Sequence, residues 1–356
     1  MKDGMNFAPK GKPAPVCGPG EFVFAATALD HGHINGQCNG LVEAGGELRW
    51  VYDPDPQKIA DFLKSHPQVK VAGSLDEIFQ DSEVKLVAAA AIPCLRGPLG
   101  CKVMEAGRDY FTDKTPFTTL AQLEQARETA LRTGKKYMVY YSERLHVECA
   151  VLAGQLVADG AIGRVIQTMG TGPHRLNAAS RPAWFFDFAQ YGGILCDIGS
   201  HQCEQFLHFT GAADARVNFS AVGNYGNPDH PELEDFGEAS FTADNGASGY
   251  FRCDWFTPDG LRTWGDGRMI LLGTEGFIEM RKYINLASPE TGGDHLFLVD
   301  KNGERHIPCA GKVGYPFFGK LILDCLNRTE EAMTQAHAFK AAELCLKAQE
   351  RALHLT

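Results

Sequence analysis

The feature that most constrains the fold is a regular alternation of short apolar runs with helical patterns between residues 21 and 142. The apolar runs are rich in Val, Phe, Tyr and Ala, which is typical of buried strands, and the segments between them show helical spacing. Strands that alternate with helices form βαβ units, and right-handed crossovers assemble these units into a parallel sheet. We therefore expect an α/β protein whose first domain is a doubly wound sheet of the Rossmann type.

The pattern changes after residue 142. Between residues 216 and 308, strands follow one another with few helices, which indicates a large, open and mostly antiparallel sheet. The last two segments, 317–329 and 337–355, are expected to close the chain as helices. We predict three parts: a flexible leader (1–20), a dinucleotide-binding Rossmann domain (21–142) and a second α/β domain (143–356).

Charge and cysteine content narrow the range of partners. The formal net charge is −10, which argues against nucleic acid and anionic membranes because both favour basic surfaces. No run of about 18 apolar residues is present that could span a membrane, and the leader lacks the apolar core of a signal peptide. The 11 cysteines include no C-x-x-C pair, which indicates reduced thiols, a cytoplasmic location and no zinc or other metal site.

The turn after the first strand, ATALDHGHING, is where a Rossmann fold binds the cofactor phosphates. A glycine fingerprint, G-x-G-x-x-G, is absent, because Ala28, Asp30 and His33 occupy its positions. Asp30 is placed to cap the first helix. His31 and His33 are either polar loop residues or groups that face a phosphate. We predict that cofactor contacts come from this turn, at Ala28, Asp30, His31, His33 and Ile34.

Further cofactor contacts are expected where other strands of the first domain end. Asp53 ends the second strand, where a carboxylate binds the ribose hydroxyls and disfavours a 2′-phosphate, although a turn-forming role is the plainer alternative. No arginine immediately follows Asp53, and Lys58 is some way off along the chain, so NAD is expected in preference to NADP. Ile92 and Pro93 end the fourth strand, and Lys114 ends the fifth.

An otherwise apolar segment, GGILCDIGSHQCEQF, contains Asp197 and His201 four residues apart. That spacing predicts that both side chains project from one helix face. The pair is either a polar patch or part of a reaction centre. Gly192 and Gly193 precede it and would allow the backbone to approach a ligand closely.

These stretches together resemble the Gfo/Idh/MocA family of sugar and inositol dehydrogenases over residues 20–356. The segment 181–211 is similar to the family pattern W…GG-x-x-x-D-x-G-x-H, and DKTPFTT at 113–119 resembles its E-K-P loop with Asp for Glu. The segment 270–280 resembles its G-T-E-G turn, and the closing helices are similar as well. The missing glycine fingerprint and Ile92, in place of the usual Thr before Pro, depart from the family.

The resemblance implies a nicotinamide cofactor on the Rossmann domain and a sugar, polyol or inositol substrate between the domains. Lys114 matches the catalytic lysine of the family, and Asp197 and His201 match its D-x-x-x-H pair. In the family the open sheet of the second domain often forms the oligomer interface, which implies a homodimer or homotetramer.

Hydride transfer from a hydroxyl-bearing carbon to a nicotinamide also requires loss of the hydroxyl proton. His201 is suited to accept it because imidazole titrates near neutrality. Lys114 would stabilise developing negative charge on the reacting oxygen, and Asp197 would orient a hydroxyl or sustain the imidazolium. Whether His201 or Lys114 is the immediate base stays open. Expected substrate contacts come from residues near the same positions: Tyr141, Glu143, His174, Arg181, Trp184, Asp197 and His201.

Three alternatives to an NAD-dependent dehydrogenase remain open from the sequence. One is an enzyme that retains NAD and uses transient oxidation for elimination, hydrolysis or epimerisation of a sugar. Another is a binding or regulatory protein that has lost the cofactor, which the missing glycines favour. The last is a metal enzyme that uses His174, Asp197 and His201.

Overall fold

The computed structural model describes residues 10–288 and 292–355. The chain divides into two compact units. The six-stranded unit comprises Lys12–Tyr140 and Pro316–Phe339, and the nine-stranded unit comprises the described parts of Met1–Gly11, Tyr141–Tyr315 and Lys340–Thr356. Among the described residues no helix is long and apolar enough to cross a membrane.

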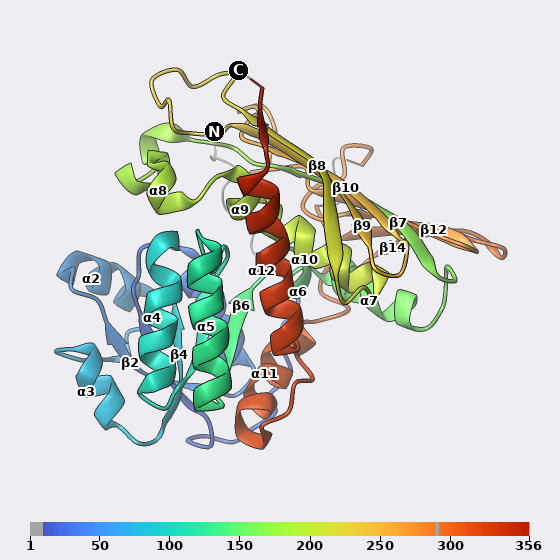
Figure 1. Cartoon of the computed structure of the whole chain (residues 1–356). Coiled ribbons are helices and arrows are strands. Elements are labelled where there is room, and N and C mark those ends of the chain that lie inside the picture. The colour runs from blue at the N-terminus through green and yellow to red at the C-terminus, as the bar shows by residue number, and fades with distance from the viewer. Residues whose placement is uncertain (1–9, 289–291, 356) are drawn as a thin grey trace. The chain divides into compact units, whose positions relative to one another are not determined.

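The six-stranded unit is a parallel sheet with the strand order β3-β2-β1-β4-β5-β6. Its strands are β1 (Val23–Thr27), β2 (Glu47–Tyr52), β3 (Lys70–Val71), β4 (Val84–Ala89), β5 (Asp109–Asp113) and β6 (Tyr137–Tyr140). Its helices are α1 (His33–Glu43), α2 (Pro56–Ser65), α3 (Leu75–Gln80), α4 (Pro93–Glu105), α5 (Leu120–Thr133) and α11 (Pro316–Asn327). Helices α4 and α5 lie side by side on one face of the sheet (Figure 1). This is the doubly wound α/β sheet that the alternating pattern predicts.

Strands at the centre of this sheet are buried along their whole length, as the apolar runs predict. Every residue of β1 and of β5 is buried, because helices cover both faces of a parallel sheet. Helix α11 packs against α1, where Gly40 faces the Phe318 ring and a Cβ atom would clash with it. The glycine therefore lets the two helices approach closely.

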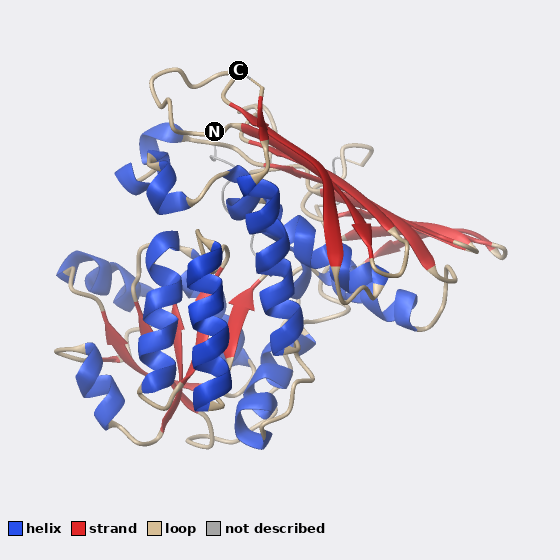
Figure 2. Cartoon of the chain, in the orientation of Figure 1, coloured by secondary structure: helices blue, strands red, loops and turns tan. Residues whose placement is uncertain are grey.

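The nine-stranded unit is a mixed, mostly antiparallel sheet (Figure 2). Its strand order is β14-β13-β12-β11-β7-β10-β9-β8-β15, and only the β7–β10 and β8–β15 pairs are parallel. The strands are β7 (Val165–Pro173), β8 (Ala215–Gly223), β9 (Phe236–Ala243), β10 (Ser248–Asp254), β11 (Arg268–Gly273), β12 (Gly276–Arg281), β13 (His295–Asp300), β14 (Gly303–Pro308) and β15 (Leu353–His354). The helices are α6 (Ser142–Leu145), α7 (Glu148–Ala158), η1 (Ala178–Ser180), η2 (Ala183–Phe186), α8 (Phe188–Tyr191), α9 (Ile194–Asp197), α10 (Gly199–Thr210) and α12 (Gln335–Glu350), the last of which begins in the six-stranded unit.

Burial alternates along β9 and β11 because helices cover one face of the sheet. In β9 every second residue is buried, which is the period expected when one face is packed. Helix α10 contacts β7, β9 and β10, and α7 contacts β12 and β13. Gly249 on β10 faces the Phe206 ring of α10, so the absence of a side chain permits the close approach of helix and sheet.

The observed units differ from the predicted division at the end of the chain. The first predicted domain ends at residue 142, close to the observed change of unit after Tyr140, but residues 316–339 belong with the six-stranded unit. Helix α11 makes the difference, since its apolar face is buried on α1 and local sequence does not reveal that partner. Of the predicted leader, residues 1–9 lie outside the described residues. From residue 10 the chain is described, and Val16 donates its backbone N–H to the Ala44 carbonyl at 2.9 Å.

Candidate active site

The loop after β1 is joined to the end of β4, next to the point where the strand order reverses. The Ala90 N–H donates to the Ala28 carbonyl at 3.1 Å, and the His31 N–H donates to the Ala90 carbonyl at 3.0 Å. Ala28 has φ +50°, a left-handed conformation that glycine adopts without strain. Ala28 therefore holds a backbone conformation that favours glycine.

Asp30 does not cap α1, so that prediction is wrong. The N-cap residue is Gly32, which has no side chain to cap the helix, and the His33 N–H donates to His31 Nδ1 at 3.3 Å. Asp30 instead accepts a hydrogen bond from Lys58 Nζ at 2.5 Å. Lys58 is thus near the first turn in space, although it is distant in sequence. The Ile34 and Asn35 N–H groups donate to the His31 and Gly32 carbonyls, both at 3.2 Å, so local hydrogen bonds close the first turn of α1.

Asp53 lies at the end of β2 and is 4% exposed. Its carboxylate accepts the Leu29 N–H at 2.7 Å and the Asp55 N–H at 2.9 Å. The carboxylate therefore ties the end of β2 to the first turn, and it also shapes its own turn. Each oxygen retains a second lone pair, so these bonds leave acceptor capacity.

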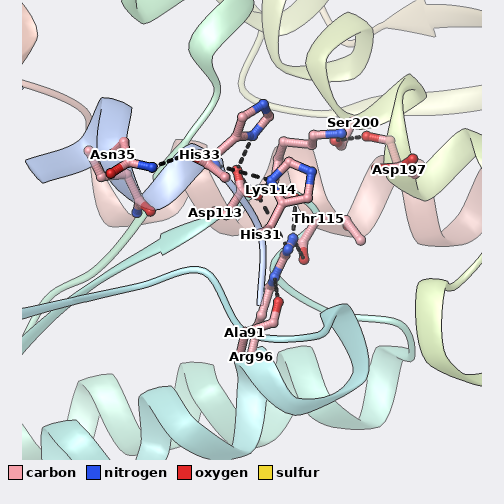
Figure 3. A network of polar contacts seen from close by, with 12 residues as sticks. His31, His33, Asn35, Ala91, Arg96, Asp113, Lys114, Thr115, Asp197 and Ser200 are labelled. Carbon is pink, nitrogen blue, oxygen red and sulfur yellow. Dashed lines mark hydrogen bonds and ion pairs between the residues drawn. The ribbon is translucent and has the colours of Figure 1, made fainter. Parts of the chain in front are cut away.

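Two histidines of the first turn converge on Asp113 at the end of β5 (Figure 3). His33 Nδ1 lies 2.9 Å from Oδ1 of Asp113, and His31 Nδ1 lies 3.2 Å from Oδ2. The two imidazole rings contact edge to face, with centroids 4.2 Å apart. Sequence reasoning placed both histidines at the cofactor turn but did not pair them with Asp113.

The electrostatics of this cluster keep Asp113 ionised. Burial raises the pKa of Asp113, but His33 and Arg96 together with hydrogen bonds from both imidazoles outweigh it, so the pKa lies well below its usual value. Burial lowers the pKa of His31 to about 4, and the neighbouring His33 acts in the same direction. At neutral pH the cluster therefore contains a carboxylate and a neutral His31 imidazole.

Arg96 of α4 fixes the loop that bears Lys114 (Figure 3). Its guanidinium is 1% exposed and donates to the carbonyls of Ala91, Lys114 and Thr115 and to Asp113 Oδ2. Lys114 follows β5 and is 6% exposed, and its N–H donates to Asp113 Oδ1 at 2.8 Å. Sequence reasoning missed Arg96, because nothing local distinguishes a buried loop-binding arginine from an exposed helical one.

Asp197 and His201 lie on two consecutive helices rather than on one. Asp197 ends α9 and His201 belongs to α10, with a break at Ile198. Ile198 keeps helical dihedral angles, and the His201 N–H donates to the Ile198 carbonyl. The backbone therefore keeps its helical sense across the break, as a common face for Asp197 and His201 requires. His201 is 2% exposed, and its ring contacts that of Tyr141.

A buried ionic network lies beside His201 in the nine-stranded unit. Glu143 Oε2 accepts hydrogen bonds from Lys282 Nζ at 2.8 Å and from Gln202 Nε2 at 3.0 Å. Gln205 Nε2 donates to the His201 carbonyl. Burial raises the pKa of Glu143, but the charges of Lys282, His201 and His174 outweigh it and lower the pKa to about 2.

Glu143 is thus an ionised carboxylate that stabilises positive charge on its two histidine neighbours. Lys282 is fully buried. It was missed because its only sequence signal is a lysine after a strand.

The remaining predicted substrate residues of this unit form an aromatic group. His174 contacts the rings of Trp255 and Trp264, with centroids 5.4 and 4.4 Å away. The Arg181 guanidinium lies over the Phe185 and Trp255 rings. Burial lowers the pKa of Arg181, and Asp197 opposes that shift. Arg181 and Asp197 are therefore electrostatic neighbours.

The other predicted site residues lie in packed positions or at the start of a helix. Tyr141 is fully buried and Ile34 is 2% exposed, so both pack in the interior of their units. Ile92 and Pro93 begin α4, next to the end of β4. Trp184 packs on Phe185. The metal alternative built on His174, Asp197 and His201 has no support among the described residues, where those three do not form a ligand group.

Comparison with known proteins defines the class. Residues 16–141 match a family model described as an oxidoreductase family with an NAD-binding Rossmann fold, and residues 151–279 match a GFO/IDH/MocA C-terminal domain. The protein is therefore an oxidoreductase of a family that binds NAD on a Rossmann fold. It belongs to the Gfo/Idh/MocA family, as the sequence resemblance indicates.

Known relatives agree with this placement. The chain is 50% identical to an oxidoreductase of known structure from Erwinia carotovora atroseptica, with a TM-score of 0.91, over 94% of this chain and 100% of that one. An aldose-aldose oxidoreductase from Caulobacter crescentus shares the fold, with 18% identity and a TM-score of 0.76 over 93% and 97% of the two chains.

The chain is also 29% identical to D-xylose dehydrogenase from Paenarthrobacter nicotinovorans. That match covers 40% of this chain and 38% of the relative's length. It therefore spans well under half of this curated relative.

Proposed function

We propose that the protein is an NAD-dependent dehydrogenase or reductase that transfers hydride between a nicotinamide and a hydroxyl-bearing carbon of a sugar, polyol or inositol. The observation that supports this most is Lys114, the residue that matches the family's catalytic lysine. It is held at the carboxyl end of β5 by Arg96 and Asp113. In a doubly wound sheet ligands bind outside that end of the strands.

The first turn fits a dinucleotide despite its missing glycines. Ala28 has a left-handed backbone of the kind that glycine adopts in a tight turn, and the dipole of α1 places partial positive charge at its N-terminus. Lys58 compensates the charge of Asp30, which would otherwise repel a pyrophosphate. Asp53 would accept ribose hydroxyls through its remaining lone pairs, which favours NAD over NADP.

The residues of the chain supply proton handling and charge stabilisation. A bound nicotinamide would act as hydride acceptor or donor. Lys114 would donate a hydrogen bond to the reacting oxygen and stabilise its negative charge. His201 would accept the hydroxyl proton, and Glu143 would stabilise the resulting imidazolium through its ionised carboxylate. Asp197 and Arg181 would orient substrate hydroxyls by hydrogen bonding.

Mass spectrometry of small molecules released from the denatured protein, with NAD and NADP titrations, tests the cofactor assignment. Retained or reversibly bound NAD supports it, and NADP binding tenfold more tightly contradicts the proposed preference. A screen of aldoses and polyols that includes D-xylose, with NAD reduction as the readout, then tests the substrate class. Absence of nucleotide binding would favour a binding protein instead.

Lys114→Ala tests the mechanism. We expect loss of turnover in the variant, because the lysine acts on the reacting oxygen, and circular dichroism verifies that the variant is folded. Lys64→Ala, an exposed lysine on α2, is the matched control and should retain full activity. Near-normal kcat in Lys114→Ala would remove the lysine from the mechanism.

We also propose that the nine-stranded sheet forms a homodimer or homotetramer interface. Apolar side chains gather on the sheet face opposite the helices. Tyr250 pairs with Met169 across neighbouring strands, and Leu272 pairs with Phe277. All four are between 37% and 45% exposed, and an apolar patch of this kind marks an interaction surface.

A further inference from the structure

The histidine–aspartate cluster at the first turn has the composition of a metal site. We propose that His31, His33 and Asp113 bind one divalent transition-metal ion, of which Zn²⁺ is representative. Ligand atoms of the three side chains all lie within 4.8 Å of one another. Within residues 10–288 and 292–355 this is the one group of His, Cys, Asp and Glu side chains with such spacing. The proposal departs from the expectation, drawn from cysteine spacing, that the protein has no metal site.

The distances suit a tetrahedral ion. His31 Nδ1 and His33 Nδ1 lie 3.2 and 2.9 Å from the two carboxylate oxygens of Asp113. Ligands of a tetrahedral zinc ion, at bond lengths of about 2.0–2.1 Å, are separated by roughly 3.3 Å. An ion would take one oxygen of Asp113 and the two imidazole nitrogens, whose ligand atoms already lie within 4.8 Å of one another. The fourth position would be left for a water or another oxygen ligand.

Without a cation, His31 Nδ1 cannot form favourable hydrogen bonds with both of its close neighbours at once. His31 Nδ1 lies 3.3 Å from the backbone nitrogen of His33 and 3.2 Å from Asp113 Oδ2. If His31 Nδ1 carries no proton, it accepts a hydrogen bond from the His33 N–H, but its lone pair then faces a lone pair of the Asp113 carboxylate. If His31 Nδ1 is protonated, it donates to the Asp113 carboxylate, but its N–H then faces the N–H of His33. A metal ion between Nδ1 and the carboxylate removes the repulsion between these two acceptors.

The surroundings orient the ligands as in known metal sites. Asp113 also accepts hydrogen bonds from Arg96 and from the Lys114 N–H, and such outer contacts fix the orientation of a coordinating carboxylate. Nitrogen and oxygen ligands in this ratio suit Zn²⁺ or other transition ions, while Mg²⁺ and Ca²⁺ prefer sites made of oxygen alone.

Positive charge near the cluster indicates that an anion accompanies the metal. Arg96 contacts Asp113 directly, and Lys114 is the next residue. A metal ion bound beside them leaves an excess of positive charge, which an anionic ligand would offset. This step rests on the proposed function, because the pyrophosphate of a dinucleotide is the anion expected at the first turn. We therefore expect the metal and NAD to enhance each other's binding by the same factor.

Titration of the metal-free, full-length protein with Zn²⁺ tests the proposal, with calorimetry as readout. Titration with Co²⁺ gives absorption bands that report tetrahedral nitrogen and oxygen ligands. We expect one ion per chain. His31→Asn and His33→Asn should each weaken binding at least about tenfold. His208→Asn, an exposed histidine on α10, is the matched control and should bind like the wild type.

Two results would overturn the metal site. One is the absence of stoichiometric binding at micromolar Zn²⁺, and the other is unchanged affinity in both histidine variants. His33 is partly exposed, so its variant is expected to fold even if the His31 variant does not, and circular dichroism verifies this. NAD binding without stoichiometric Zn²⁺ overturns the metal site and leaves the proposed function standing. Zn²⁺ binding without NAD binding overturns the proposed function and leaves the metal site standing.

Discussion

At the residue scale, buried charges in the nine-stranded unit depend on their partners. Glu143 and Lys282 are 2% and 0% exposed as side chains and lie 2.8 Å apart. Removal of one partner from a buried ion pair leaves an uncompensated charge and costs about 3–5 kcal/mol. Glu143→Gln is therefore expected to lower the free energy of unfolding at pH 7 by about 3 kcal/mol, measured by chemical denaturation.

The double variant Glu143→Gln/Lys282→Met is the control for that prediction. It removes both charges, so most of the lost stability should return. The same pair predicts a pH dependence, because the pKa of Glu143 is lowered to about 2 in the folded protein. Its stabilisation is full above about pH 4.3, the unfolded pKa of glutamate, and is lost as the pH falls toward 2. Equal stability of the wild type and Glu143→Gln at pH 7 would contradict the prediction.

The contribution of Asp294 to stability should depend on pH in the opposite direction from that of Glu143. Burial raises its pKa to about 6, despite an opposing hydrogen bond from the Cys149 N–H. Stability due to this group is therefore greatest when the carboxyl is protonated, and it declines as the pH rises from about 4 to 6. Asp294→Asn should be more stable than the wild type at pH 8, by roughly 1–3 kcal/mol.

Asparagine suits position 294 because it tolerates the left-handed φ of +61° there. The test compares thermal or chemical unfolding of both proteins at pH 4 and pH 8. The two should be nearly equal at the lower pH. A stability difference that does not change between the two pH values would show that the Asp294 carboxylate does not titrate as described.

At the scale of single elements, the turn between β1 and α1 is strained at Ala28. A non-glycine residue in the left-handed region costs about 1–2 kcal/mol. Ala28→Gly should therefore stabilise the protein by about 0.5–1 kcal/mol after allowance for the entropy of glycine. Ala25→Gly, within the buried strand β1, is the matched control and should destabilise. Chemical denaturation of both variants provides the measurement, and destabilisation by Ala28→Gly would show that the strain is absent.

The same turn shows where elements can and cannot be predicted from sequence. The strand before it was predicted because its apolar run is local. The capping role predicted for Asp30 was wrong, because its actual partner, Lys58, lies 28 residues further along the chain. The break between α9 and α10 at Ile198 was likewise hidden, since the residues around it are compatible with a continuous helix.

At the scale of the whole chain, sequence periodicity predicts both sheets but not every partner. The alternation of strands with helices predicted the parallel sheet, and the succession of strands predicted the antiparallel one. Both predictions were possible because the spacing of apolar residues shows which faces of an element are buried. Assignment of residues 316–339 to the second domain failed because α11 packs on α1, nearly the whole chain length away. Family motifs supplied Lys114, Asp197 and His201, whereas Arg96 and Lys282 emerged only from three-dimensional contacts.

The exposed apolar face of the nine-stranded sheet leads to a prediction about assembly. Its strands pair Tyr250 with Met169 and Leu272 with Phe277, which places four partly exposed apolar side chains on that face. Burial of that surface between two copies should make the protein a dimer or tetramer, measured by size-exclusion chromatography with light scattering. Leu272→Asp/Phe277→Asp should yield a monomer, because two charges per chain cannot be buried without partners.

Leu131→Asp is the matched control for this assembly prediction. Leu131 lies on α5 of the six-stranded unit and is 87% exposed, so it is an apolar surface residue outside the nine-stranded sheet. The control should keep the wild-type mass. A wild-type monomer at micromolar concentration, or an unchanged oligomer in the double variant, would show that this face does not mediate assembly. If the double variant is a folded monomer that still binds NAD, assembly and cofactor binding are independent properties of the two units.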